Sequence, residues 1–168
     1  MNPVAQSPRL WLQLLGEKDA PFVLELVNQP AWIANIGDKG VRTLDGAKRY
    51  LAEGPLASYR QHGFGLYLVS LKDGTPIGLC GLLKRDYLDH PDIGYALHSG
   101  HWGQGYAREA ARAVLDLARQ KGLGTLLAIT LPQNQPSCAL LETLGFSLDG
   151  LTQVPGGSEA LRLYRLAL

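Results

Sequence analysis

Long apolar runs, cysteines and net charge are all scarce in this 168-residue sequence. The two cysteines, Cys80 and Cys138, are too few for the disulfide framework of a small secreted scaffold, so we expect two unpaired, buried thiols. No apolar run approaches the ~18–20 residues that a membrane helix needs. Residues 1–8 lack the basic start and the apolar stretch of a signal peptide. We therefore expect a soluble, cytoplasmic protein without a membrane partner.

The charged residues nearly cancel, since 16 Lys and Arg stand against 15 Asp and Glu and give a formal net charge of +1. This total implies no basic face, which argues against a nucleic-acid partner but leaves a local basic patch open. The 20 glycines and 10 prolines indicate many tight turns. A chain of this length fits one domain of about 100–200 residues, and it shows no internal repeat or linker-like stretch. We expect a single domain over residues 1–168.

Hydrophobic patterning predicts strands and helices along the whole chain. The predicted strands are residues 9–15, 66–71, 76–83, 92–98, 126–131, 146–148 and 160–168. The predicted helices are residues 22–28, 43–53 with a short continuation to 62 after an interruption at Gly54-Pro55, 105–121 and 136–144. Pro30 is expected to stop the first helix, and residues 31–42 show no regular pattern.

One part of this pattern predicts the topology at the centre of the fold. In residues 105–121 the apolar side chains recur three and four positions apart, which is typical of an amphipathic helix. Residues 126–131 are almost all apolar, as expected for a parallel strand covered on both faces. The strand at 92–98, this helix and this second strand therefore form a parallel βαβ crossover. We expect an α/β (α+β) fold, with a mixed, mostly antiparallel, twisted sheet of about seven strands around this crossover and about four helices.

The turn that opens the crossover helix, residues 99–107, is rich in glycine. A helix start leaves about four N–H groups without intrahelical partners at the positive end of the helix dipole. Gly103 and Gly105 therefore predict an anion site for a phosphate or diphosphate, and the alternative is that they only shape a tight turn. A dinucleotide fingerprint would need glycine where Arg108 stands, and the sequence contains no Gly-Lys-Thr/Ser loop. Another kind of nucleotide-binding domain is disfavoured for these reasons.

Three stretches, in this order and spacing, resemble the GNAT superfamily of N-acetyltransferases, in particular the branch similar to the ribosomal-protein N-terminal (serine/alanine) acetyltransferases. They are Pro8-Arg9-Leu10-Trp11-Leu12 with a two-helix insertion after it, Ile93-Gly94-Tyr95-Ala96-Leu97 followed by Trp102-Gly103-Gln104-Gly105-Tyr106-Ala107-Arg108-Glu109-Ala110, and Asn134-Gln135-Pro136-Ser137 before Leu140-Leu141-Glu142-Thr143-Leu144-Gly145-Phe146. The resemblance covers roughly the whole chain and implies a GNAT-like fold. It also implies acetyl-CoA as the acetyl donor and cosubstrate, an amine as the acceptor, and a monomer or a homodimer.

The resemblance also implies how the chain would hold acetyl-CoA. The diphosphate would sit on the backbone N–H groups of Gly103, Gln104, Gly105, Tyr106, Ala107 and Arg108. The pantetheine arm would pair like an extra strand with Tyr95, Ala96 and Leu97, between the strands at 92–98 and 126–131. Asn134 matches the cofactor-contacting asparagine of the family. Trp102 departs from the broad family motif, which has Gln or Arg at this position, although Trp is common in this branch.

Acetyl transfer to an amine needs a donor for the oxyanion, and the departing thiolate takes up a proton. By resemblance, a backbone N–H near Tyr95–Leu97 is the oxyanion donor and Ser137 is the acid, with helix capping as the alternative role for Ser137. The tyrosine and the glutamate that other relatives use are here Leu141 and Ile129. Asp92, at the head of the central strand, is a candidate base, and an exposed strand-edge carboxylate is the alternative. Deprotonation through water, or by the equilibrium of the substrate, would need no base from the protein.

The insertion would shape the acceptor pocket, and its residues Trp32, Tyr50, Tyr59 and His62 either pack among the helices or line that pocket. Basic side chains outnumber acidic ones there: Lys39, Arg42, Lys48, Arg49 and Arg60 against Asp38, Asp45 and Glu53. This excess slightly favours an anionic acceptor over a polycationic aminoglycoside. Because the customary tyrosine and glutamate are missing, a non-catalytic acyl-CoA binding or regulatory module is the alternative function.

Other chemistries find little support in the sequence. The histidines and aspartates between residues 86 and 101 form no ligand pairs at helical spacing, so we expect no metal. A serine hydrolase is disfavoured because no Gly-x-Ser-x-Gly elbow occurs. Cys138 lies on an apolar helix, which favours core packing over a reactive thiol.

Overall fold

The computed structural model describes residues 3–168 and contains an eight-stranded sheet in the order β1-β2-β3-β4-β5-β6-β8-β7. The strands are β1 (Ala5–Gln6), β2 (Leu10–Gln13), β3 (Leu66–Leu71), β4 (Pro76–Leu83), β5 (Asp92–Leu97), β6 (Thr125–Thr130), β7 (Ser147–Thr152) and β8 (Leu161–Ala167). Neighbouring strands pair antiparallel except β5 and β6, which are parallel. The predicted mixed, mostly antiparallel sheet is confirmed. Strand β1 is additional, and at two residues it is too short for a periodic pattern.

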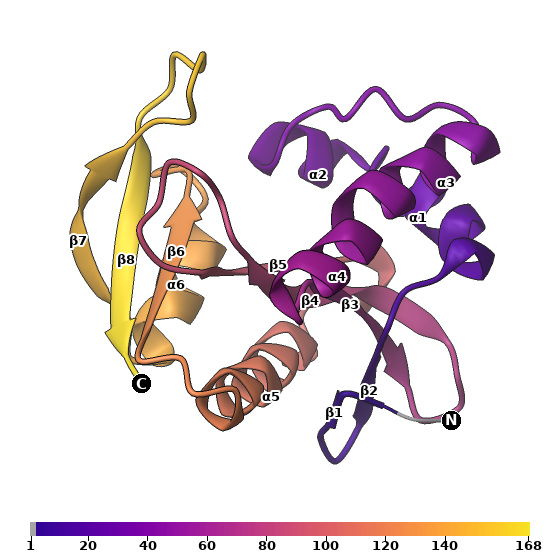
Figure 1. Ribbon diagram of the computed structural model, residues 1–168, viewed down its shortest axis with the longest axis horizontal. Coiled ribbons are helices and arrows are strands. Elements are labelled where there is room, and N and C mark those ends of the chain that lie inside the picture. The colour runs from indigo at the N-terminus through magenta and orange to yellow at the C-terminus, as the bar shows by residue number, and fades with distance from the viewer. Residues whose placement is uncertain (1–2) are drawn as a thin grey trace.

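The helices are α1 (Ala20–Leu26), α2 (Pro30–Asn35), α3 (Leu44–Leu51), α4 (Ala57–His62), α5 (Tyr106–Gln120) and α6 (Gln135–Thr143). Helix α5 leads from β5 to β6 and completes the predicted crossover (Figure 1). Short 3-10 segments precede α1 and α5, at Glu17–Asp19 and Ser99–His101. Across residues 3–168, no helix has the length and apolar character needed to cross a membrane.

Two segments that contain proline differ from the sequence prediction. Pro30 starts α2, so residues 31–42 are not irregular throughout. Proline suits the first position of a helix because its φ is already helical and its missing N–H would have no partner there. Gly54-Pro55 does not interrupt the helical run, since the π-helical turn Ala52–Leu56 joins α3 to α4. This wider turn keeps the chain helical around a residue that has no N–H to donate.

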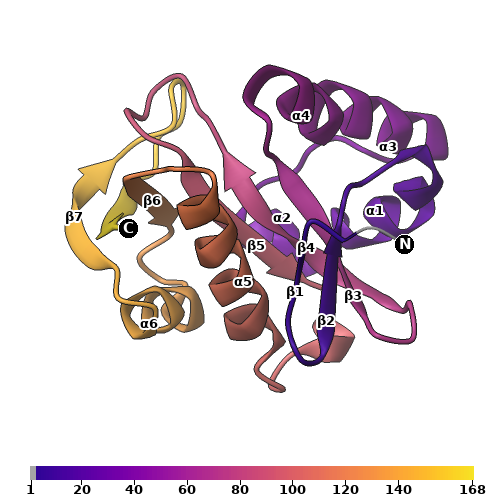
Figure 2. The same ribbon diagram turned by 60° about the horizontal axis from the view of Figure 1, so that its bottom comes forward.

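The sheet carries a hydrophobic core on each face. Tyr67 and Val69 on β3 belong to the core that includes α5, and Leu68 between them belongs to the core under α1 and α3. This alternation is what a strand buried on both faces requires. Figure 2 shows α5 on the side of the sheet opposite α1 and α3. Cys80 and Cys138 are buried in the core with α5 and are unpaired, as the sequence predicts.

Strands β5 and β6 pair only near their beginnings. Their bridge joins Asp92 to Leu127, whereas β5 stays paired with β4 as far as Leu97 and β6 stays paired with β8 as far as Thr130. The sheet therefore divides into two halves that diverge beyond Asp92, with α5 between them (Figures 1 and 2). The edge of β5 that faces β6 is left without a neighbouring strand over most of its length.

Candidate active site

The turn before α5 presents a row of unpaired backbone N–H groups. Gly103 and Gly105 have φ angles of 76° and 81°, a left-handed conformation that favours glycine. Within residues 3–168 the N–H groups from Gly103 to Arg108 have no acceptor, and the first helical bond joins the Glu109 N–H to the Gly105 carbonyl at 3.1 Å. These donors lie at the positive end of a 15-residue helix. The turn therefore has both the donors and the electrostatic field that bind an anion.

This turn opens into a groove of about 700 Å³ beside the divergence of β5 and β6. Every site residue predicted from the sequence lines the groove, except Gln104, which is exposed in the turn, and Asp92, which lines an adjoining cavity. The β5 residues Tyr95–Leu97 form one wall, and Asn134 and Ser137 lie opposite at the start of α6. The structure thus gathers predicted residues from three separate stretches of sequence onto one concave surface.

Trp102 occupies a backbone carbonyl at the Leu97 end of the free edge of β5. Its indole N–H donates to the Leu97 carbonyl at 2.9 Å, although its side chain is otherwise exposed. The backbone groups of β5 that stay free for a ligand therefore lie closer to Tyr95.

Arg9 lies beside the glycine turn, a position that the sequence did not single out. Its guanidinium stacks on the Tyr106 ring, 4.4 Å from the centroid, and its Nε donates to Glu109 Oε1 at 2.8 Å. The Glu109 carboxylate also accepts hydrogen bonds from the Ser7 hydroxyl and the Arg9 backbone N–H. This cluster ties the N-terminal strands to the first turn of α5 and places a positive charge next to Gly105. Its members lie 100 residues apart, so no local pattern reveals it.

Ser137 contacts Tyr95 across the groove. The Ser137 Oγ and the Tyr95 hydroxyl oxygen are 2.7 Å apart. Helix α6 is capped by Asn134, whose Oδ1 accepts from the Ser137 N–H at 3.4 Å, so the capping role considered for the Ser137 side chain is wrong. Burial raises the pKa of Tyr95 to about 12, and the hydrogen bond with Ser137 only partly opposes this rise. The phenol therefore stays protonated near neutral pH and can donate to the Ser137 oxygen.

A second cavity of about 200 Å³ adjoins the groove. The groove and the cavity share Trp32, Asn35, Ile36, Tyr95, Ala96, Asn134 and Ser137. The cavity alone extends to Lys39, Tyr50, Arg85 and Asp92. Two of the aromatic residues in the insertion, Trp32 and Tyr50, thus line it. The other two, Tyr59 and His62, stack on Tyr67 and Phe64, with ring centroids 5.6 Å apart in each pair.

Asp92 is a buried carboxyl group in the wall of this cavity. Its exposed fraction is 0%, and the Arg85 Nε donates to its two oxygens at 3.0 and 3.1 Å. Burial raises the pKa of Asp92 to about 6, against the opposing charges of Arg85 and Lys84. The alternative of an exposed strand-edge carboxylate is wrong, because β5 lies inside the sheet between β4 and β6. Arg85 was missed in the sequence because it lies in a loop that has no periodic pattern.

The histidines near the turn make other contacts. The His98 Nε2 lies 2.9 Å from Glu25 Oε1, and the His98 ring meets the His101 ring edge-on at 6.4 Å between centroids. Over residues 3–168, no three His, Cys, Asp or Glu side chains are grouped in a way that could hold a metal ion.

Comparison with known sequences points to one family. A family model described as "Acetyltransferase (GNAT) domain" matches residues 9–147. A protein of Bacillus licheniformis, described as "Uncharacterized N-acetyltransferase p20", is 38% identical over 77 residues, which are 45% of this chain and 43% of p20. The curated relatives are matched over less than two thirds of their own length.

Solved structures share the whole fold. An acetyltransferase from Agrobacterium tumefaciens has a TM-score of 0.82 and 30% sequence identity over 97% of this chain and 93% of that chain. RimL, a ribosomal L7/L12 α-N-protein acetyltransferase solved in complex with coenzyme A, has a TM-score of 0.79 and 18% identity over 96% of both chains. The likeness to RimL is one of fold.

Proposed function

Because this chain belongs to the acetyltransferase (GNAT) family, we propose that it transfers the acetyl group of acetyl-CoA to a primary amine, which attacks directly in a ternary complex. The observation that carries the proposal is the row of unpaired N–H groups from Gly103 to Arg108 beside the free edge of β5. The acceptor is a small-molecule amine or a protein N-terminus. The complex of RimL with coenzyme A supports coenzyme A as the ligand class, and the name of RimL supports a protein N-terminus as one acceptor class.

The residues of the groove fit acetyl-CoA group by group. The diphosphate would accept hydrogen bonds from the N–H groups of Gly103–Arg108, and Arg9 would add a positive charge beside them. The backbone groups of β5 that stay free near Tyr95 would pair with the amides of the pantetheine arm, as a strand edge pairs with an added strand. Asn134 uses its Oδ1 to cap α6, which leaves its amide nitrogen for the ligand. Bound in this groove, acetyl-CoA supplies the activated thioester.

Ser137 is the proposed acid. Its Oγ lies at the junction of the groove and the cavity, 2.7 Å from the Tyr95 hydroxyl. When the Tyr95 phenol donates to this oxygen, the Ser137 proton is directed elsewhere and can pass to the departing sulfur. Tyr95 then acts as a positioning residue for the acid.

Asp92 is the proposed base. It lines the cavity that adjoins the groove, and its pKa of about 6 leaves it ionised at neutral pH yet more basic than an exposed aspartate. The carboxylate would take the proton of the attacking amine directly or through one water molecule. Proximity supplies the remaining part of the rate acceleration, because holding two substrates in line can lower the barrier by ~7–11 kcal/mol.

Release of free thiol from acetyl-CoA, measured with a panel of primary amines, tests the proposed function. We expect thiol release that depends on the amine, together with an N-acetylated product of matching amount by mass spectrometry. A chain that binds acetyl-CoA and acetylates no amine would instead be the non-catalytic acyl-CoA binding module, which Leu141 and Ile129 support by replacing the customary tyrosine and glutamate.

A further inference from the structure

Three hydrogen-bond donors from three separate segments line the cavity but not the groove. Lys39 lies in the loop between α2 and α3, Tyr50 lies on α3, and Arg85 lies in the loop between β4 and β5. Burial lowers the pKa of Lys39 and raises the pKa of Tyr50, and the charge of Arg85 is the second influence on each pKa, so the three side chains lie near one another. These groups donate hydrogen bonds, and only the tyrosine can also accept one.

Lys39 has no counter-ion within residues 3–168. Among the described residues, no ion pair or hydrogen bond engages its ammonium group. Burial and, to a smaller extent, the charge of Arg85 lower the pKa of Lys39. A partly buried ammonium beside a guanidinium is unfavourable unless a negative charge joins them. A negatively charged group of a ligand would balance the charge of Lys39 at this point.

Some hydrogen-bond donors of Arg85 have no acceptor in the part of the chain that the structure describes. Its Nε serves both oxygens of Asp92, and its Nη1 makes only a long contact of 3.5 Å with the Tyr87 hydroxyl. Its Nη2 has no partner within residues 3–168. The outer edge of a guanidinium is the part that forms paired hydrogen bonds with a carboxylate or a phosphate. Asp92 balances only one of the two positive charges that line the cavity.

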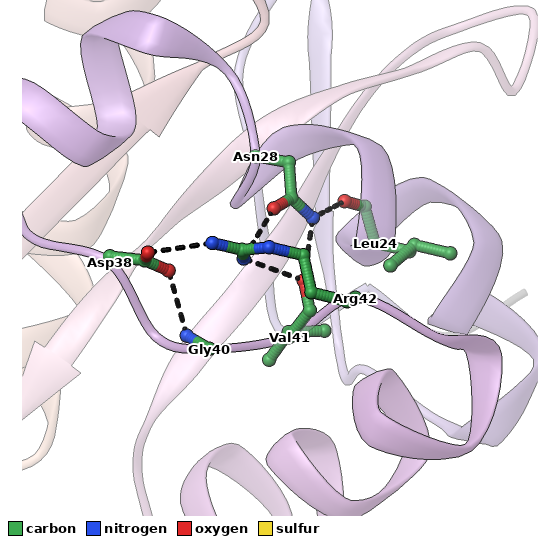
Figure 3. Close-up of polar contacts among 6 residues, drawn as sticks. All are labelled: Leu24, Asn28, Asp38, Gly40, Val41 and Arg42. Atoms are coloured by element: carbon green, nitrogen blue, oxygen red, sulfur yellow. Dashed lines mark hydrogen bonds and ion pairs between the residues drawn. The ribbon is translucent and has the colours of Figure 1, made fainter.

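A network of polar contacts fixes the loop that carries Lys39 (Figure 3). Asp38 accepts from the Gly40 N–H at 2.8 Å and from the Arg42 Nη2 at 2.6 Å. The Arg42 Nη1 also donates to Asn28 Oδ1 at 2.8 Å, which joins the loop to the end of α1. Lys39 thus lies between two anchored residues, Asp38 and Gly40, so binding an anion would not require the loop to become ordered.

Resting on the proposed function, we infer that the acceptor is a small amine that carries a carboxylate or phosphate group, and that Lys39, Tyr50 and Arg85 bind this anionic group. The amino group would then point toward Asp92 and Ser137, where the cavity meets the groove. A volume of about 200 Å³ suits a molecule of the size of a free amino acid. The two cations disfavour polyamines and other polycationic acceptors.

Matched pairs of amines test this inference. Each L-amino acid is compared with its C-terminal amide, and O-phosphoethanolamine with ethanolamine, at saturating acetyl-CoA. We expect kcat/KM for the best acid-bearing amine to exceed that of its neutral partner by about tenfold or more, the size of a hydrogen bond between charged groups. The amino group of an amide is less protonated at neutral pH, so basicity alone would favour the amide. The two kinds of pair distinguish a carboxylate from a phosphate.

Substitutions of Lys39 test whether this residue binds the anionic group of the acceptor. Lys39→Met should lower about tenfold the ratio of kcat/KM for the acid-bearing amine to kcat/KM for its neutral partner. Lys39→Arg should preserve most of this ratio. Lys48→Met is the matched control, because Lys48 pairs with Glu17 at 3.3 Å on the surface of the insertion. Calorimetric titration of the preferred acid-bearing amine into protein saturated with coenzyme A measures recognition without turnover, and Lys39→Met should weaken this binding by a similar factor.

The outcomes separate the inference from the proposed function. Equal rates for acid-bearing and neutral amines, or a ratio that Lys39→Met leaves unchanged, would overturn the inference and leave amine acetylation intact. Faster acetylation of peptides than of free amino acids would overturn the assignment of a small acceptor. A chain that neither binds acetyl-CoA nor releases thiol with any amine would overturn the proposed function and the inference together.

Discussion

The Tyr95 hydroxyl and the Ser137 Oγ lie 2.7 Å apart and join β5 to α6 across the divergence of the sheet. Tyr95 is anchored in the half of the sheet formed by β1 to β5, and Ser137 lies in the first turn of α6, the helix that follows β6. The contact therefore places a hydroxyl group between the groove and the cavity. Both residues lie on regular elements, so the proposed acid is not carried by a loop.

Ser137→Ala should lower kcat by about 10²–10⁴, the contribution typical of a positioned acid. The affinity for acetyl-CoA should stay unchanged, because the diphosphate and the pantetheine arm are held elsewhere. Steady-state kinetics and calorimetric titration with acetyl-CoA measure the two quantities. Ser147→Ala, at an exposed position in β7, is the matched control. A kcat within a factor of two of the unsubstituted chain would remove Ser137 from the mechanism.

Tyr95→Phe should lower kcat less than Ser137→Ala does, since it removes only the hydrogen bond that orients the acid. One such bond is worth about 1 kcal/mol, which corresponds to about a fivefold loss. In the double variant, the effect of Tyr95→Phe should disappear, because there is no longer a hydroxyl to orient. Additive losses in this cycle would show that Tyr95 acts independently of Ser137.

Asp92 should give the pH profile a limb near pH 6. Folding raises the pKa of this carboxyl group from 3.8 to about 6, so it is protonated and cannot accept a proton below about pH 6. The value of kcat/KM should therefore fall as the pH drops through 6, in addition to any fall caused by protonation of the acceptor amine.

Asp92→Asn separates these two limbs. The variant should lose the limb near pH 6 and keep the one that belongs to the amine. Measurement of kcat/KM against pH for both chains gives the comparison. A limb near pH 6 that persists in Asp92→Asn would assign that titration to another group and favour deprotonation through solvent.

Gly105→Ala should weaken coenzyme A binding by about tenfold or more, because it places a Cβ on the turn that would hold the diphosphate. The φ of 81° at Gly105 also strains alanine by about 1–2 kcal/mol. Gly74→Ala is a matched control, since Gly74 has a φ of 95° in the turn between β3 and β4 and open space around it. Both variants should lose stability, and only Gly105→Ala should lose affinity. Equal affinities in the two variants would argue against the turn as the diphosphate site.

Much of the fold follows from local sequence. Residues 66–71 and 76–83 form β3 and β4 with the predicted bounds, because strand periodicity and an Asp73-Gly74 turn agree there. Proline gave weaker guidance, since the same residue can end one helix and begin another. Pro30 begins α2, where its missing N–H would have no partner, and Pro55 lies inside a continuous helical run, where a π-helical turn accommodates it.

The candidate site was only partly predictable. The glycine turn and Ser137 could be recognised from the sequence, but the contact between Ser137 and Tyr95 depends on how far the two halves of the sheet diverge. Lys39 and Arg85 lie in irregular loops, so no periodic pattern links them to the cavity. Asp92 was expected either as a base or as an exposed carboxylate, and its burial depends on the central position of β5.

The most direct test of the account is the melting temperature of the chain with coenzyme A and with pantetheine, which lacks the diphosphate. At a ligand concentration of about 100 Kd, coenzyme A and acetyl-CoA should each raise the melting temperature by about 5–10 °C. Pantetheine, NAD and ATP at equal concentration should raise it by much less. A rise with pantetheine as large as that with coenzyme A, or no rise with acetyl-CoA, would contradict the claim that the Gly103–Arg108 N–H groups hold a diphosphate.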